Sequence, residues 1–220
     1  ARSGLGSSSS FTVGMLNALY ALRGGMIDKR KLAQEAIRIE QQVIGEEVGS
    51  QDQIWAAFGG INRIDFPISG DFQVRPLIVP GDRQQKLLDH LLLFFTGFSR
   101  FASEIAKKKI ENFNKRHEHI KTMTSLVDEA MEIIQSETSS ILEIGDLLNQ
   151  SWQLKRELAD TVTTPEIDEI YETALSAGAR GGKLLGAGGG GFFLLFVEPD
   201  KQSNVKESLK NLVQVDFGID

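Results

Sequence analysis

A glycine- and serine-rich segment at residues 3–10 has the composition of a phosphate-binding loop. It leads directly into an apolar stretch with helical spacing. Glycines let the backbone turn sharply, and the first turn of a helix offers N–H groups without helical partners and a positive dipole end. Serine hydroxyls add donors for phosphate oxygens or a ligand for Mg²⁺. The lysine of a G-x-x-x-x-G-K-[ST] loop is missing, and a serine-capped helix start is the alternative interpretation.

A second cluster, at residues 186–191, holds five glycines and one alanine between two apolar stretches. A tight hairpin needs about two residues of this kind. The longer run therefore indicates that a ligand or another backbone segment comes close to it. A flexible connection between two strands is the alternative.

Two of the carboxylates between these clusters are candidates for chemistry. Asp52 stands between two glutamines, just before a short helical stretch that contains Trp55, and Glu40 precedes it by twelve residues. Taken alone, an aspartate before a short helix caps its N-terminus, and a helical glutamate is ordinarily solvated.

The elements that must position these residues follow from periodicity and from turn residues. Apolar spacing predicts a helix that follows the serines at 7–10 and ends before the glycines at 24–25, and further helices at 28–44, 53–58, 165–177 and 201–212. An almost wholly helical stretch is predicted over 100–158. Strands are expected at 61–68, 72–79, 90–95, 183–185 and 192–197, with an edge strand at 213–217. The chain is therefore predicted to be α+β, with a domain boundary near residues 76–86.

Composition narrows the class of protein. The chain has 220 residues, a hydrophobic content of 41% and a net charge of −6, which fits an ordinary globular protein and disfavours nucleic acid as a partner. It has no cysteine, which excludes disulfides, cysteine zinc sites and a thiol nucleophile and suits a reducing cytoplasm. No apolar run reaches membrane-spanning length, so we expect a cytoplasmic protein without a membrane partner.

These motifs together resemble the superfamily named for galactokinase, homoserine kinase, mevalonate kinase and phosphomevalonate kinase (GHMP kinases). The first loop matches the superfamily's P-x-x-x-G-L-G-S-S motif from the serine onward, and residues 183–193 (KLLGAGGGGFF) match its late glycine motif. Within the superfamily, residues 49–53, 58–60 and 95–100 most resemble the D-glycero-D-manno-heptose 7-phosphate kinases.

The resemblance implies a two-domain GHMP-kinase fold with an incomplete N-terminal domain. Residues 1–80 would be the later part of the nucleotide-binding domain, and residues 81–220 the C-terminal domain. We expect a missing segment of roughly a hundred residues, by comparison with relatives, so that Leu16, Leu19 and the strand near Ile61 would lack a packing partner.

The resemblance also implies roles by position. Asp52 would orient the acceptor hydroxyl and accept its proton late in the reaction, although its reference pKa is about 3.9. Ser8 and Glu40 would hold Mg²⁺, with a serine next to Ser8 as the alternative ligand. The nucleotide would be bound by both glycine motifs, through Gly4, Leu5, Gly6, Ser7, Ser8, Ser9, Gly186, Gly188 and Gly189.

The expected activity is ATP-dependent phosphorylation of a sugar hydroxyl. In the heptose interpretation, the acceptor is the anomeric hydroxyl of a sugar that already carries a distal phosphate, with Gln51, Arg100 and Lys155 as candidate substrate ligands. For Arg100 and Lys155, ordinary surface or helix-face cations are the alternative. Another acceptor, a non-catalytic sensor of sugar and nucleotide, and an inactive fragment are the rival functions, and the sequence leaves the oligomeric state open.

Overall fold

The computed structural model describes residues 4–68, 70–97, 117–158 and 161–218. The first half of the chain is mainly helical and ends in a small hairpin. Its elements are α1 (Ser7–Leu22), α2 (Lys29–Arg38), the π-helical turn η1 (Ile39–Val43), α3 (Gln51–Phe58), β1 (Asn62–Asp65) and β2 (Gln73–Pro76).

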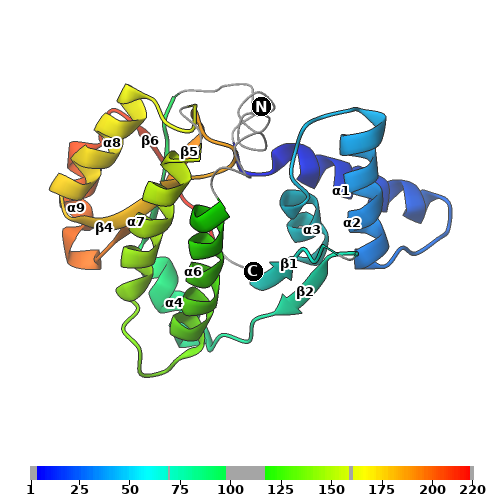
Figure 1. Ribbon diagram of the computed structural model, residues 1–220, viewed down its shortest axis with the longest axis horizontal. Coiled ribbons are helices and arrows are strands. Elements are labelled where there is room, and N and C mark those ends of the chain that lie inside the picture. The colour runs from blue at the N-terminus through cyan, green and yellow to red at the C-terminus, as the bar shows by residue number, and fades with distance from the viewer. Residues whose placement is uncertain (1–3, 69, 98–116, 159–160, 219–220) are drawn as a thin grey trace.

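The second half surrounds one sheet. Its elements are α4 (Gly81–Asp89), β3 (Leu91–Phe95), α6 (His117–Gln135), α7 (Glu143–Arg156), α8 (Pro165–Ser176), β4 (Ala179–Leu184), β5 (Phe192–Val197), the 3₁₀ turn η3 (Pro199–Lys201), α9 (Gln202–Ser208) and β6 (Val213–Val215). Figure 1 shows the two halves side by side, with the start of α1 approaching the sheet.

In the first half, three helices bury their apolar faces against one another and against the hairpin. Asp28 begins α2 by accepting a 2.9 Å hydrogen bond from the Lys31 N–H, which satisfies one free donor of the first turn. One apolar cluster joins α1 to α2, and a second joins α2 and α3 to the hairpin. Their buried members are Val13, Leu32, Ala36, Ala33, Ile54 and Phe72.

In the second half, the sheet has the strand order β4-β5-β3-β6, and each neighbouring pair is antiparallel. The fully buried rings of Trp152, Tyr171 and Phe193 form the centre of its core, with centroids 5.4 to 6.3 Å apart. Offset or edge-to-face aromatic pairs at such distances stabilise a core beyond their buried area. A separate cluster packs α6 and α7 against the same sheet near Phe196.

Strand β4 is longer than expected because its glycines let helix α7 approach closely. The sequence predicts a strand at 183–185, whereas β4 runs from Ala179 to Leu184. A Cβ added at Gly181 would lie 2.1 Å from the Gly145 carbonyl oxygen of α7. Only glycine fits there, so a position that reads as a strand breaker is required inside the strand.

Other boundaries shift for local reasons. The predicted helix 28–44 changes to π-helical geometry at Ile39. The predicted strands 61–68 and 72–79 pair only over β1 and β2, and the predicted final helix stops at Ser208. The helical prediction for 100–158 holds for α6 and α7, which are separated by a turn that begins at Ser136, while residues 98–116 lie outside the described residues.

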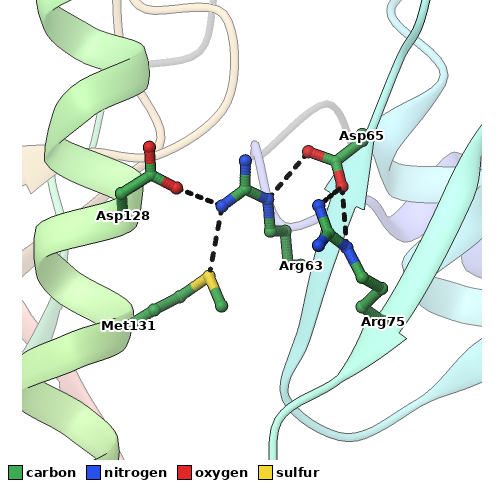
Figure 2. A network of polar contacts seen from close by, with 5 residues as sticks. All are labelled: Arg63, Asp65, Arg75, Asp128 and Met131. Carbon is green, nitrogen blue, oxygen red and sulfur yellow. Dashed lines mark hydrogen bonds and ion pairs between the residues drawn. The ribbon is translucent and has the colours of Figure 1, made fainter.

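A polar network joins the two halves at a distance from the sheet. Arg63 of β1 donates a hydrogen bond to Asp65 at 2.8 Å and forms an ion pair with Asp128 of α6 (Figure 2). The same guanidinium also contacts the Met131 sulfur. Arg75 of β2 binds the other oxygen of Asp65. These bonds lower the pKa of Asp65, mainly through Arg75 and then Arg63, and raise the pKa of Arg63.

One face of α1 exposes large apolar side chains. Phe11, Met15, Leu19 and Leu22 are all exposed, and Leu22 is 83% accessible. The sequence predicts that Leu16, Leu19 and the strand near Ile61 lack packing partners. That expectation is wrong for Leu16, which packs against the Val13 and Leu32 cluster. It is also wrong for the strand, which pairs with β2 and packs Ile64 against the buried cluster of α2 and α3. Among the helices described, none is both long and apolar enough to cross a lipid bilayer.

Candidate active site

The two glycine motifs meet in space. We call residues 4–6 the first loop and residues 185–191 the second loop. A Cβ added at Gly186 would lie 2.7 Å from the Gly4 Cα, and one added at Gly4 would lie 2.9 Å from the Leu185 carbonyl oxygen. Both glycines have positive φ, +82° at Gly4 and +69° at Gly186. Side chains are thus excluded here by space and by conformation, and the backbones touch directly.

The second loop is fixed along its length by hydrogen bonds from outside it. The Lys155 amino group of α7 donates to the carbonyls of Leu184, at 2.7 Å, and Gly186, at 2.8 Å. The Gly189 N–H donates to the Val162 carbonyl at 2.8 Å, and the Gly191 N–H to the Thr96 hydroxyl at 3.1 Å. These contacts hold a glycine-rich loop in one shape, although its sequence favours many.

Glu40 forms the centre of a buried polar cluster beneath the start of α1. The residue is only 2% exposed, and its carboxylate accepts hydrogen bonds from three side chains. Ser9 and Thr12 of α1 each donate at 3.0 Å, and Gln53 of α3 donates at 2.5 Å. A buried carboxylate is tolerated when its lone pairs are occupied in this way. The cluster therefore ties α1, α3 and the π-helical turn together.

Asp52 lies at the edge of this cluster, facing the first loop. A Cβ added at Gly6 would lie 3.3 Å from both Cβ and Cγ of Asp52. Solvent reaches one side of the Asp52 side chain, and protein atoms crowd the other. This crowding is the main cause that raises the pKa of Asp52, and the nearby charge of Glu40 raises it further. The carboxylate is thereby placed next to the loop with an increased affinity for a proton.

The donors available for a metal ion here are all oxygens. Within the described ranges, no group of three or more His, Cys, Asp or Glu side chains could hold a metal ion. Glu40 and the hydroxyls of α1 remain, together with the buried Gln53 Oε1, which has no hydrogen-bond partner. Such a set fits Mg²⁺, which usually takes one or two carboxylates and completes its shell with water and substrate phosphates.

The predicted residues fall into three groups. The structure brings Gly4, Gly6, Asp52, Glu40 and Gly186 together. Gly188 and Gly189 face Val162, and Leu5, Ser7, Ser8 and Gln51 are exposed around the first loop and the start of α3. Arg100 lies outside the described residues.

Lys155 and Ser8 lie differently from what their predicted roles suggest. Lys155 is 6% exposed, and its amino group holds the second loop, which favours a bracing role over direct substrate contact. The side chain of Ser8 is exposed, and its neighbour Ser9 is the one that contacts Glu40. Neither placement tests substrate or metal binding, so both roles stay predictions.

Sequence reasoning missed two members of the Glu40 cluster. Thr12 lies three residues after Ser9, so that both hydroxyls share one face of α1, and this spacing was a usable signal. Gln53 directly follows Asp52, but its contact with Glu40 depends on how α3 packs against the π-helical turn. No local pattern reveals that contact.

Comparisons with known proteins agree with this geometry. The family model described as the GHMP kinases N terminal domain matches residues 1–60, and the model described as GHMP kinases C terminal matches residues 126–214. Together they cover more than half of the chain, and the chain belongs to the GHMP kinase family. The boundary expected between residues 80 and 81 lies between the two matches and stays a prediction.

Among its relatives, the chain is similar to the D-glycero-alpha-D-manno-heptose 7-phosphate kinase of Campylobacter jejuni, with 30% identity over 94% of this chain and 61% of that protein. It is also similar to the galactokinase of Pyrococcus furiosus, with 28% identity over 94% of this chain and 64% of the relative.

A crystal structure of a D-glycero-D-manno-heptose 1-phosphate kinase from Bacteroides thetaiotaomicron matches with a TM-score of 0.71 and 25% identity. The match covers 99% of this chain and 63% of that one. The chain thus spans less than two thirds of the length of these relatives, and its mixed helix and sheet architecture is that of GHMP kinases.

Proposed function

We propose that this chain forms most of an ATP-dependent sugar kinase, and that its acceptor is a sugar phosphate such as a heptose 7-phosphate. The observation that carries the proposal is the position of Asp52. Its carboxylate lies against Gly6 of the first loop, and the first loop in turn touches the second. A group that can orient a hydroxyl is thereby placed beside a loop that can cradle phosphates.

Phosphoryl transfer requires positioning and charge stabilisation more than covalent chemistry. The first turn of α1 would direct N–H groups and a positive dipole end at the phosphates of the nucleotide. Asp52 would align the acceptor hydroxyl and take its proton as the hydroxyl oxygen bonds to the γ-phosphorus and the bond from that phosphorus to ADP breaks, so that ADP leaves. Its raised pKa makes it a better acceptor for that proton than an ordinary aspartate.

Glu40 and the hydroxyls of α1 are the residues that would hold Mg²⁺, and the ion would supply charge neutralisation across the phosphates. Ser9, Thr12 and Gln53 hold the Glu40 carboxylate in one orientation beneath the loop. The proposal keeps Ser8 as a candidate metal ligand beside Ser9: the Ser8 hydroxyl is exposed two residues after the first loop, whereas Ser9 is the serine that contacts Glu40.

The preference for a phosphorylated sugar rests on the similarity to the heptose 7-phosphate kinase. A non-catalytic sensor is the rival function. A sensor has no need of a proton acceptor, and the placement of Asp52 beside the loop favours an enzyme.

The test is ATP consumption with Mg²⁺ against a panel of sugars and sugar phosphates that includes heptose 7-phosphate, using protein expressed from the complete open reading frame. Asp52→Asn should lower kcat about 10²- to 10⁴-fold, as expected for loss of a proton-accepting group. The Kd for ATP should stay within about twofold, because Asp52 orients the acceptor and not the nucleotide.

The matched control is Asp71→Asn, which removes an exposed carboxylate that pairs with Arg30 far from the loops. This variant should keep its turnover. Nucleotide binding without turnover on any acceptor would favour the sensor, and absence of nucleotide binding would overturn the proposal altogether.

A further inference from the structure

Lys183 is the penultimate residue of β4, two residues before the second loop begins. Its side chain reaches α7, where the amino group contacts the Ser151 hydroxyl at 3.3 Å. Ser151 lies one helical turn before Lys155, which holds the carbonyls of Leu184 and Gly186. The Lys183 amino group therefore lies beside the base of the loop that touches Gly4.

The charge of Lys183 is not balanced by any carboxylate in the described part of the chain. The Ser151 hydroxyl is its one hydrogen-bond partner there, and no ion pair involves Lys183. Burial of the amino group lowers the pKa of Lys183. An ammonium group loses hydration on burial and ordinarily regains that free energy from an acidic partner.

Arg180, three residues earlier on the same strand, shows the ordinary arrangement. Its guanidinium forms two hydrogen bonds with Asp146 of α7, at 2.8 and 2.7 Å. Both cations project from β4 toward the same helix, yet among the described residues only Arg180 has a carboxylate partner. Lys183 is thus a partly buried cation near the base of the second loop, and no carboxylate in the described ranges pairs with it.

We propose that Lys183, with Ser151 orienting its amino group, is a phosphate-binding residue of the candidate active site. A lysine ammonium is a compact point charge that binds phosphate oxygens, and the serine hydroxyl can donate to a second oxygen. The inference rests on the proposed function, because it names a ligand group that the same candidate site would bind. The phosphate has two sources there, the nucleotide or the phosphorylated acceptor.

Calorimetric titration of the same full-length protein distinguishes these sources. One arm compares ADP with adenosine, and the other compares heptose 7-phosphate with heptose. Lys183→Met should weaken the phosphate-bearing member of one pair about 10- to 100-fold, as expected for a lost charged hydrogen bond. The phosphate-free member of that pair should change less than twofold. Lys183→Arg, which keeps the charge, should restore much of the loss.

The control is Arg180→Met, which removes a cation from the same strand and should leave both arms unchanged. A selective loss for ADP assigns the phosphate to the nucleotide, and a selective loss for heptose 7-phosphate assigns it to the acceptor. The proposal is overturned if neither arm changes or if the phosphate-free ligands weaken equally.

If Lys183→Met does not fold, Ser151→Ala provides the decisive variant. It should weaken the same phosphate-bearing ligand by at least about threefold, since the lysine loses the hydroxyl that orients it. The proposed phosphate site is contradicted if Ser151→Ala binds the phosphate-bearing ligand as tightly as the unmodified protein. It is also contradicted if Lys183→Gln, which lacks the charge, binds that ligand with full affinity. These binding measurements do not depend on turnover, so failure of the kinase assay leaves them valid and overturns only the proposed function.

Discussion

Replacing Gly186 by alanine tests whether the two loops must touch. The new Cβ would lie 2.7 Å from the Gly4 Cα and 3.2 Å from the Gly4 carbonyl oxygen. Both neighbours are backbone atoms, so neither can rotate away as a side chain would. Ordinary contact begins beyond 3.4 Å, and the loops would therefore separate by about 1 Å.

Two costs follow from this separation. The left-handed φ of +69° costs about 1–2 kcal/mol for a residue with a Cβ, and overpacking adds about 1–3 kcal/mol. A displacement of about 1 Å between reacting groups lowers a rate about 10²-fold. We therefore expect a loss of about 2–5 kcal/mol in the free energy of unfolding and a fall of about 10²-fold in kcat/KM.

Gly24→Ala is the matched control. Gly24 has a φ of +71°, nearly the same as Gly186, but an added Cβ there meets nothing within 4 Å. This control should lose only the conformational cost of about 1–2 kcal/mol and should keep its activity. Urea unfolding and steady-state kinetics on both variants separate the two contributions. If Gly186→Ala loses no more stability or activity than Gly24→Ala, the contact between the loops contributes to neither the free energy of unfolding nor kcat/KM.

Three further predictions concern residues outside the loops. Lys155→Met should lower the free energy of unfolding by about 2–4 kcal/mol, because the Leu184 and Gly186 carbonyls lose a charged donor. Urea unfolding measures this change, and a loss below about 1 kcal/mol contradicts the bracing role. Burial, and then the charge of Glu172, raises the pKa of Tyr171 to about 12, which ultraviolet titration of the phenol can check. The pKa of the Tyr171 phenol in the folded protein exceeds its unfolded value near 10, so folding favours the protonated phenol. The stability that depends on this phenol is therefore complete below pH 10 and is lost as pH rises toward 12. Tyr171→Phe should not show this loss of stability at alkaline pH. A double-mutant cycle between Arg63 and Asp128 should give a coupling of only about 0.2–1 kcal/mol, since Asp128 is 56% exposed, and a coupling above about 2 kcal/mol would show that the network is screened from solvent.

The sequence was sufficient for elements whose local chemistry and packing agree. Helix α8 begins at Pro165 behind the capping Thr164, and strand β5 spans the apolar run from Phe192 to Val197, both as predicted. Proline at the first helical position and an uninterrupted apolar run between turns are strong local signals.

The parts that could not be predicted depend on tertiary contact. Gly181 and Gly182 look like strand breakers, yet they belong to β4 because α7 and β5 approach too closely for any side chain. The contacts of Glu40 likewise require a change to π-helical geometry at Ile39, which no propensity indicates. The sequence predicted which residues to consider for the candidate site. Only the packing shows that Gly4 and Gly186 form touching loops, that Lys155 holds the second loop, and that Glu40 lies in a buried cluster.

The touching loops also have a consequence for the order of events during synthesis. Gly4 and Gly186 come from opposite ends of the chain, and contacts between distant positions form late because chain closure must precede them. A ribosome adding about 5–20 residues per second needs roughly 10–40 seconds to pass from the first loop to the second. Throughout that interval, Glu40 and Asp52 exist without the second half of their site. A nascent chain would thus bring the two loops into contact only after the second loop has been made, since Gly186 follows Gly4 by 182 residues.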